Sequence, residues 1–552
     1  MPNIVISKKG LEGLLGKKLD LSTVKELVFD NLKGEVDKVE GDELTIDFGD
    51  TNRPDLWSVE GVARALRPIL GLKQKDYKTT KSSFKLSVDS SVAKVRPFIA
   101  CAAVKNVKLN NESIKSLIQM QDKLDTTYGR KRKKSSIGIY DLDKINWPVT
   151  YTTIKPDEIK FVPLGFEKEM TPKEILKKHP KGEEFGNILS GLKKYPVLVD
   201  KKKNVLSMPP IINYDSLGKV TEKSKNLLVE VTGTEKETVN QSLNLVTSAL
   251  SERGGKLYSV QIDYPEEKQI TPTFKGEKHK VDLLESENLL GMKFKIPEAK
   301  KLLEKMGYSI TKKQKSSLDV MAPFYRKDIM HQVDIIEDLA IAYGYHNFEK
   351  VLPEIPTSGE LSEQTLRKNK VRELLIGMGI NEIFSFNLSN KKILLEQVKR
   401  KGEPVEILNP INTNYTCLRN SLVPTMIDFF KANKRVKFPQ EVFEVGPIFA
   451  KNSKLANKVS QKDTICVGIT HPKAGFTEIK SVLDTLLYNL DIGYSIKPRK
   501  DATFIDGRCG DVIVSGKKIG VIGEVHPEVL INFDLENPVA VFEIEVDGIW
   551  QT

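Results

Sequence analysis

Apolar residues recur with the period of a helix over residues 323–345, PFYRKDIMHQVDIIEDLAIAYGY, near the middle of the chain. At about 100° per residue, one narrow stripe contains Ile329, Val333, Ile336, Ala340 and Tyr343. This stripe predicts an amphipathic helix of roughly four turns. We expect Asp328 to cap its beginning and Gly344 to end it, because these residue types favour those positions.

Three carboxylates, Asp334, Glu337 and Asp338, fall on a second face of this helix. Like charges at these spacings repel by roughly 0.2–0.5 kcal/mol per pair, so we expect a positive group among them. A magnesium ion is one candidate, because hard divalent cations prefer oxygen ligands. The alternative is a solvated acidic face whose charge is matched by Arg326, Lys327 or nearby lysines. The spacing leaves both interpretations open.

The central pattern has a counterpart near the beginning of the chain. Residues 14–71 and 289–345 both begin Leu-Leu-Gly, continue through an amphipathic helix and two short strand patterns, and finish in a helix that ends near a glycine. Before that last helix both carry Arg-x-Asp and an apolar residue: Arg53, Asp55 and Leu56, then Arg326, Asp328 and Ile329. We therefore predict two copies of one helix–hairpin–helix unit. Such a unit binds nucleic acid in some proteins and only packs in others, and no conspicuous basic helix decides between these roles.

The remaining pattern indicates two further regions. Residues 74–91 are polar and lysine-rich, as in a linker, and short strands and helices then mix up to about residue 265, which indicates an α+β region. Residues 351–363 form a second linker with prolines and a glycine, and no regular βαβ alternation follows, so we expect an antiparallel-sheet α+β domain. The predicted domains are 1–73, 92–265, 270–347 and 358–552.

Composition is that of a globular protein. Of 552 residues, 39% are hydrophobic and 29% charged, and the net charge of +12 is compatible with nucleic-acid binding without requiring it. The four cysteines lie far apart and lack zinc-type spacing, which disfavours a zinc site or a disulfide framework. We find no apolar segment typical of a signal peptide or a membrane span, so we expect a soluble cytoplasmic protein without membrane contact.

Two basic runs lie within residues 92–265. Arg130–Lys134 precedes the strand pattern SSIGIYDLD, and Lys201–Lys203 precedes VLSMPPIIN. We interpret the second run as a solvated turn. The first run is denser and contains arginine, which favours contact with phosphate groups.

The segment SMPPIIN combines two prolines with a hydroxyl, Ser207, and an amide, Asn213. Downstream, the alternating pattern LLVEVTGT places Glu230 and Thr232 on one side of a strand. No histidine or cysteine stands close by in the sequence to form a nucleophile–base pair, so hydrolysis here would use a water positioned by neutral groups and a carboxylate. An ordinary turn followed by an ordinary strand explains the same pattern equally well.

Eight motifs, in this order, resemble the β subunit of phenylalanyl-tRNA synthetase in its shorter archaeal and eukaryotic form. They are TNRPDLWSVEGVARAL, GRKRKKSSIGIYDLD, SMPPIINYDS, VEVTGT, FYRKDI with DIIEDLAIAYGY, CLRNSLVPTM, FEVGPIF and IGEVHPEVL. Together they cover nearly the whole chain. The resemblance implies an α2β2 tetramer in which the α subunit uses ATP to join phenylalanine to tRNA(Phe). It also implies a multidomain α+β fold with two winged-helix-like units, an α+β editing domain and a class II synthetase-like antiparallel-sheet domain.

The resemblance also implies roles for individual residues. Magnesium, shared with the α subunit, would be bound by Asp328, Asp334, Glu337 and Asp338, the last being usually glutamate in the family. An editing pocket that removes tyrosine wrongly attached to tRNA would be formed by Ser207, Asn213, Glu230, Thr232, Gln121 and Arg130. Active class II domains carry an arginine directly after a strand such as FEVGPIF, whereas Ala450 and Lys451 stand here. We therefore expect this domain to pair with the α subunit without performing adenylation.

Two alternatives have other consequences. A free-standing nucleic-acid-binding or regulatory protein built from synthetase domains would have no need of the complete set of motifs. A stand-alone editing hydrolase would not need the residues beyond about 350. The complete order of motifs favours the synthetase subunit over both.

Overall fold

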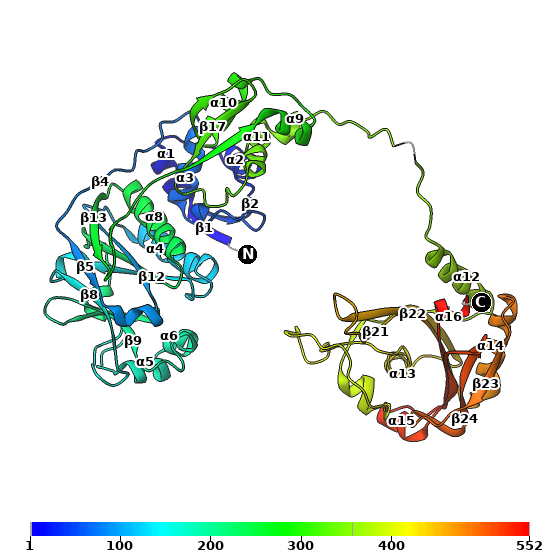
Figure 1. Ribbon diagram of the computed structural model, residues 1–552. Coiled ribbons are helices and arrows are strands. Elements are labelled where there is room, and N and C mark those ends of the chain that lie inside the picture. The colour runs from blue at the N-terminus through cyan, green and yellow to red at the C-terminus, as the bar shows by residue number, and fades with distance from the viewer. Residues whose placement is uncertain (1–2, 356, 551–552) are drawn as a thin grey trace. The chain divides into compact units, whose positions relative to one another are not determined.

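The computed structural model describes residues 3–355 and 357–550, and the chain folds into two compact units, Met1–Val351 and Leu352–Thr552 (Figure 1). Both units mix helices with β-sheets, as the predicted α+β class requires. The boundary falls inside the predicted linker at 351–363. In the part of the chain that is described, no helix combines the length and apolarity needed to cross a membrane.

Unit 1 contains two small three-stranded sheets with the same topology. The first has the order β1-β3-β2 and the second β15-β17-β16, and in each the edge strand that comes first in the chain precedes two helices, a hairpin and a last helix. The first comprises β1 (Asn3–Ser7), α1 (Lys8–Leu15), α2 (Leu21–Leu32), β2 (Glu35–Glu40), β3 (Glu43–Asp47) and α3 (Val59–Ile69). The second comprises β15 (Glu277–Asp282), α9 (Leu283–Leu290), α10 (Ile296–Lys305), β16 (Ser309–Lys313), β17 (Ser317–Ala322) and α11 (Gln332–Tyr343). The sequence pattern found the hairpins and last helices and missed both first strands.

The repeated Arg-x-Asp motif makes the same contact in both copies. Arg53 Nη2 lies 2.8 Å from Asp55 Oδ2, and Arg326 Nη2 lies 2.7 Å from Asp328 Oδ2, each with a second bond from Nε. Both arginines are buried, so each bidentate pair keeps a guanidinium charge matched inside the protein. The shared ion pair explains why the repeat retains these two residue types at this spacing.

The prediction for the central helix is confirmed at its end and wrong at its beginning. Gly344, with φ 95°, ends α11, and Ile336 and Ala340 are buried on its inner side. The helix begins at Gln332 and is capped by His331, because Asp328 is already held by Arg326. Apolar Val333 is 44% exposed, so the core-facing stripe is narrower than predicted.

A large curved sheet forms the centre of unit 1, with the strand order β11-β10-β9-β8-β5-β13-β6-β12-β7. Its strands are β4 (Thr79–Thr80), β5 (Lys85–Val88), β6 (Phe98–Lys105), β7 (Ser135–Asp141), β8 (Val149–Ile154), β9 (Tyr195–Val199), β10 (Val205–Met208), β11 (Ile212–Asn213), β12 (Leu227–Gly233), β13 (Lys256–Asp263) and β14 (Lys268–Thr271). Its helices are α4 (Asn111–Lys123), α5 (Pro172–Lys178), α6 (Pro180–Phe185), α7 (Asp215–Gly218) and α8 (Lys236–Glu252). The predicted linker at 74–91 therefore contains strands: β5 joins the sheet through parallel pairing with β13 and β8, which the polar pattern concealed.

Unit 2 is built on a seven-stranded sheet with the order β18-β21-β22-β26-β25-β24-β23, antiparallel except for the short β18–β21 pair. It comprises α12 (Glu363–Gly377), β18 (Asn381–Glu382), β19 (Leu388–Ser389), β20 (Cys417–Leu418), α13 (Val423–Ala432), β21 (Gln440–Lys451), β22 (Val459–Thr470), α14 (Phe476–Asn489), β23 (Tyr494–Pro498), β24 (Phe504–Val514), β25 (Lys517–Val525), α15 (Pro527–Asn532), β26 (Val539–Glu545) and α16 (Val546–Ile549). Separate apolar clusters cover the two sides of this sheet, one involving α12 and α14 and the other α13 and α15.

Candidate functional site

The candidate pocket lies where the two ends of the large sheet approach each other. Strands β10 and β11 end one side of the strand order, β7 ends the other, and residues from both sides line one cavity of about 170 Å³. Of the predicted residues, this cavity brings together Gln121, Ser207, Asn213 and Glu230. We call the place where the two sheet ends meet the seam. It joins segments that are far apart in the chain, which is why their spacing did not reveal it.

Strand register positions the main polar groups in pairs. Ser207 on β10 lies directly opposite Asn213 on β11, and Glu230 on β12 lies opposite Gly138 on β7. A Cβ at Gly138 would lie 2.3 Å from Tyr140 Oη and 2.4 Å from Glu230 Oε2, so any other residue here would displace this hydrogen-bonded pair. Ser207 is 1% exposed, and its Oγ has no hydrogen-bond partner within the described residues.

The carboxylate of Glu230 is held by Tyr140. Tyr140 Oη donates a hydrogen bond of 2.5 Å to Glu230 Oε2 and lies 3.4 Å from Asn213 Oδ1 across the seam. Burial raises the pKa of Glu230 to about 7, although this hydrogen bond and the charge of Arg96 act in the opposite direction. Glu230 therefore changes its charge near neutral pH, as a group used in acid–base or hydrogen-bond chemistry requires.

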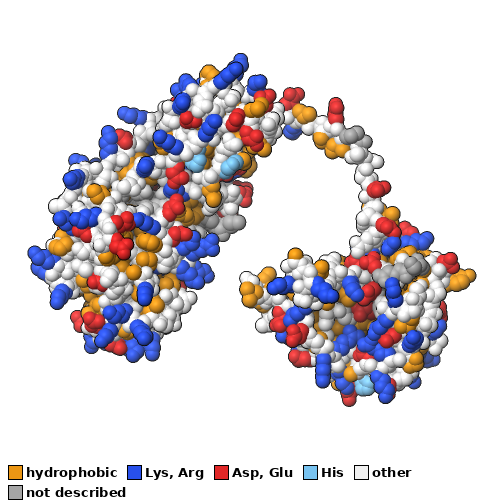
Figure 2. All heavy atoms as spheres, in the orientation of Figure 1, with side chains coloured by type: hydrophobic (Ala, Val, Ile, Leu, Met, Phe, Trp, Pro, Cys, Tyr) orange, Lys and Arg blue, Asp and Glu red, His pale blue; other side chains and the backbone are white. Residues whose placement is uncertain are grey.

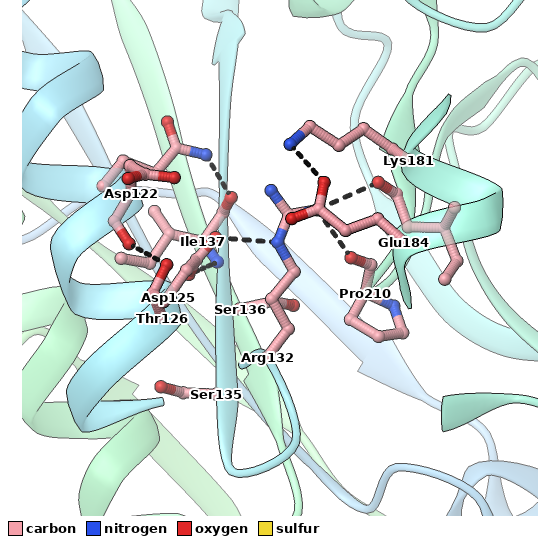
Figure 3. A network of polar contacts seen from close by, with 12 residues as sticks. Asp122, Asp125, Thr126, Arg132, Ser135, Ser136, Ile137, Lys181, Glu184 and Pro210 are labelled. Carbon is pink, nitrogen blue, oxygen red and sulfur yellow. Dashed lines mark hydrogen bonds and ion pairs between the residues drawn. The ribbon is translucent and has the colours of Figure 1, made fainter. Parts of the chain in front are cut away.

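Arg132 connects the two sides of the seam (Figure 3). Its Nη1 donates to the carbonyl oxygens of Pro210 and Ile211 at 2.9 and 3.0 Å, its Nε lies 3.2 Å from Asp125 Oδ2, and its guanidinium stacks 4.3 Å from the ring of Phe185. The Pro209–Pro210 peptide bond is cis. Arg132 thus fixes the proline turn that forms one wall of the pocket.

Two predicted residues lie outside this lining. Thr232 is fully buried behind the wall, where its Oγ1 accepts a hydrogen bond of 2.9 Å from Arg96 Nε. Arg130 lines a different hollow, together with residues such as Trp57 and Lys327. The backbone explains the outcome for the basic run: residues 130, 131 and 132 all have positive φ, and this left-handed turn directs Arg132, not Arg130, into the pocket.

Sequence reasoning missed Tyr140, Arg132, Gly138 and Asp125. Both Tyr140 and Gly138 stand in the strand pattern SSIGIYDLD, where a glycine inside a strand signals the close approach of another group. That signal was available in the sequence. The sequence did not reveal which residues contact this strand, because Tyr140 meets Asn213 only across the seam.

The four acidic residues at α11 do not form one cluster. Asp328 and Asp338 both pair with Arg326, whose Nη1 lies 2.7 Å from Asp338 Oδ2, and Tyr308 donates 2.6 Å to the same oxygen. Asp334 accepts the backbone N–H groups of Met330 and His331 at the helix start, and half-exposed Glu337 pairs with Lys33. The Arg326 charge, together with the N–H groups and Lys33, provides the positive partner that the repelling carboxylates required.

The magnesium assignment to these positions stays a prediction, and in this structure each of the four carboxylates has a protein partner. Within residues 3–355 and 357–550, no group of three or more His, Cys, Asp or Glu side chains is arranged to hold a metal ion. A buried carboxylate that pairs with arginine has its charge already compensated, so it gains less from a cation. These contacts agree with the alternative of a charge-matched acidic helix, in which Arg326 is the main partner.

Known proteins match the chain over almost its full length. Family models described as "tRNA synthetase B5 domain" and "Phenylalanyl tRNA synthetase beta chain CLM domain" match residues 279–345 and 348–546. The phenylalanine–tRNA ligase β subunit of Thermococcus sibiricus is 39% identical over 99% of this chain and 98% of its own length. The chain belongs to the phenylalanyl-tRNA synthetase β-subunit family. The resemblance inferred from the eight motifs is confirmed.

Two other members of the phenylalanyl-tRNA synthetase β-subunit family are also similar to this chain. The β subunit of Pyrococcus abyssi is 38% identical over the whole of both chains. A crystal structure of an N-terminal fragment of the Pyrococcus horikoshii β subunit covers 62% of this chain and 99% of its own, with 40% identity and a TM-score of 0.60. Because the matches run across both units, a protein assembled from a few borrowed synthetase domains is not favoured.

Proposed function

We propose that this chain is the β subunit of a phenylalanine–tRNA ligase, which supports a catalytic α subunit and hydrolyses tyrosine wrongly attached to tRNA(Phe). The observation that carries the hydrolytic part is the pocket at the seam, where Glu230, Asn213 and Ser207 converge on one cavity. In this proposal the α subunit uses ATP, and magnesium is shared between the two subunits. The domain assignment 1–73, 92–265, 270–347 and 358–552 is part of the same proposal.

Recognition of tyrosine would depend on the hydroxyl group that phenylalanine lacks. Glu230 is the carboxylate that lines the cavity, and its second oxygen remains available to accept a phenol O–H while Tyr140 holds the first. Asn213 and Ser207 would orient the ester and the attacking water, the latter through its unpaired Oγ. A site that hydrogen-bonds a substrate hydroxyl can discriminate about 10⁴-fold or more when its polar groups are otherwise unpaired.

Tyr140 reduces that discrimination. Because it already donates to Glu230, a phenylalanyl group entering the pocket does not leave the carboxylate wholly without a partner. We therefore expect the preference for tyrosine to be smaller than the limit for an unpaired acceptor. Tyr140 is a positioning residue, since it acts through Glu230.

The proposed association with the catalytic α subunit is supported by the surface of unit 2. Figure 2 shows apolar side chains among charged ones on the surface of unit 2. The large apolar residues of this unit that are mostly exposed include Phe384 (82%), Phe386 (69%), Leu408 (98%) and Ile411 (100%). Large apolar residues with this exposure favour a contact surface for another protein. The catalytic α subunit is the occupant that the family implies, in an α2β2 assembly.

An adenylation site is expected to carry arginines at strands β21 and β26, and neither strand of unit 2 contains one. At the end of β21, Lys451 pairs with Glu403, and β26, VAVFEIE, carries no arginine. A phosphoryl-transfer site without bidentate guanidinium groups lacks its main electrostatic stabilisation.

The test is deacylation of tyrosyl-tRNA(Phe) by the full-length chain. We expect wild type to release tyrosine and Glu230→Gln to release it at least about tenfold more slowly, since it loses the charged acceptor but keeps the shape. Glu222→Gln is the matched control, because Glu222 is an exposed acid in the same region. Equal rates for wild type and Glu230→Gln would contradict the assignment of this pocket.

A further inference from the structure

A second cavity lies in unit 2, and the proposed function makes no use of it. Its volume is about 550 Å³, which is within the range of sites that bind small molecules. Its walls come from the central strands of the seven-stranded sheet and from two loops outside the strands. The lining residues from strands β21, β22, β25 and β26 are Ile448, Thr464, Lys518, Ile519, Gly520, Val521, Glu543 and Glu545, and those from the loops are Lys399, Arg400, Lys401, Arg499 and Asp501.

Five cationic and three acidic side chains line this cavity. Three of the cations are paired: Lys399 with Glu528, Arg499 with Asp501 and Asp511, and Lys518 with Asp511. Arg400 and Lys401 differ from them, because neither forms an ion pair within the described part of the chain. These two neighbouring cations are therefore free to bind an anion.

Neutral groups hold Arg400 in place. Its Nε donates to Thr503 Oγ1 at 3.0 Å and its Nη1 to Ser421 Oγ at 2.9 Å. Ser421 Oγ in turn donates to Glu543 Oε2 at 2.9 Å. Arg400 is thus oriented by hydrogen bonds to neutral groups and forms no ion pair within the described residues, although its charge lowers the pKa of nearby Asp501; this pre-organised guanidinium suits an anionic ligand.

The floor of the cavity contains a polar group without a partner. Thr464 on β22 is 1% exposed, and its Oγ1 has no hydrogen-bond partner among the residues described. It lies beside Glu545 of β26 in register, and the Nε of Arg499 is unpaired as well. Buried polar groups are normally satisfied, so these two atoms point to a ligand that carries hydrogen-bonding groups.

We propose that this cavity binds a nucleotide. Arg400 and Lys401 would bind its phosphate, and Glu543 would accept hydrogen bonds from its ribose hydroxyls. The apolar surface of Ile448 and Val521 suits a base. A small anion alone suits the cavity less well, because three carboxylates share it and would repel such an ion without receiving a donor. The proposal concerns binding alone and includes no chemical step.

The experiment measures binding of AMP and of inorganic phosphate to the full-length chain by calorimetry, in a buffer without phosphate. The variants are Arg400→Gln and Lys401→Gln, with Lys454→Gln as the control, because Lys454 is an exposed loop lysine of unit 2 outside the cavity lining. Wild type is expected to bind AMP more tightly than phosphate. We expect Arg400→Gln to weaken AMP binding about tenfold or more and Lys401→Gln about threefold, with no change in the control.

Four results would each overturn the proposal. The first three are an absence of AMP binding by wild type, equal affinities for AMP and phosphate, and AMP binding that is unchanged in both single variants, Lys401→Gln and Arg400→Gln. Because Lys401 is exposed and unpaired, its variant should fold even if loss of the Arg400 hydrogen bonds disturbs the loop. Equal weakening by Lys454→Gln would show non-specific attraction to a basic surface and would also overturn it.

Discussion

Tyr140 Oη donates a 2.5 Å hydrogen bond to Glu230 Oε2, and the two residues stand on the neighbouring antiparallel strands β7 and β12. The bond orients the carboxylate toward the cavity between the two ends of the large sheet. It also stabilises the charged form of a carboxyl group that burial would otherwise keep protonated. The charge and the direction of Glu230 are therefore both set by a phenol that the pocket itself provides.

The first prediction concerns the pH dependence of deacylation. If charged Glu230 accepts the substrate hydroxyl, the rate with tyrosyl-tRNA should rise with pH through a midpoint near the pKa of about 7. Tyr140→Phe removes the hydrogen bond that favours the carboxylate, so its midpoint should move to higher pH. Rate profiles of wild type, Tyr140→Phe and the control Glu222→Gln measure this. A midpoint that stays unchanged in Tyr140→Phe would contradict the positioning role.

The second prediction concerns stability. The pKa of Glu230 is raised from 4.5 to about 7 in the folded chain, so the folded state binds this proton more tightly than the unfolded state. Its contribution to stability is fully present below pH 4.5 and is lost as the pH rises through 7. Glu230→Gln should therefore reduce the fall in the free energy of unfolding of unit 1 across this window. Urea titrations at several pH values test it, and an identical pH slope in both proteins would refute it.

The third prediction separates Arg132 from Arg130. Arg132→Lys loses the guanidinium, whose Nη1 donates to two carbonyl groups of the proline turn and whose Nε lies near Asp125, so we expect deacylation to fall about tenfold or more. Arg130→Lys is the matched control, because Arg130 is an exposed residue of the same turn and does not line the pocket. Single-turnover rates with tyrosyl-tRNA distinguish them. A larger loss in Arg130→Lys would restore Arg130 as the pocket residue.

The fourth prediction concerns the acidic residues at α11. Arg326→Leu leaves Asp328 and Asp338 without their cation, and breaking a buried pair in this way costs about 3–5 kcal/mol. Asp334→Ala removes one half of the capping box that Asp334 forms with His331 at the start of α11, which costs about 0.5–2 kcal/mol. Glu337→Ala, with a half-exposed side chain, should cost less than about 1 kcal/mol.

Unfolding curves of these three variants give the order of the costs. Elemental analysis of wild type and of the Asp334→Ala, Glu337→Ala double variant should show the same magnesium content, since the four carboxylates have protein partners. Magnesium that is bound by wild type and lost from the double variant would return the metal site to these residues.

The fifth prediction concerns the partner. The chain alone should show no phenylalanine-dependent ATP–pyrophosphate exchange, because strands β21 and β26 carry no arginine. The double variant Leu408→Asp, Ile411→Asp should weaken co-purification with a catalytic α subunit, since both side chains are almost fully exposed apolar groups. Ile531→Asp, also at an exposed apolar residue of unit 2, is the control. Exchange activity in the pure chain, or intact assembly of the double variant, would contradict this part of the proposal.

The sequence alone determined features that depend on local spacing. Gly344 ends α11 because a positive φ at that position favours glycine, and the repeated Arg-x-Asp motif pairs with itself over two residues. The order of the motifs was sufficient to indicate the family. It also predicted that polar residues of SMPPIIN and VEVTGT form one site. Three of them, Ser207, Asn213 and Glu230, line one cavity.

Only the tertiary structure decided the partner of each charged or polar group. Tyr140 meets Asn213, and Arg132 meets Pro210, because the two ends of the large sheet come together, and no local pattern encodes that closure. At α11 the spacing showed that a positive charge was needed. Burial of Arg326 between Asp328 and Asp338 decided that a guanidinium provides it, because a carboxylate partner offsets the cost of removing a guanidinium from water.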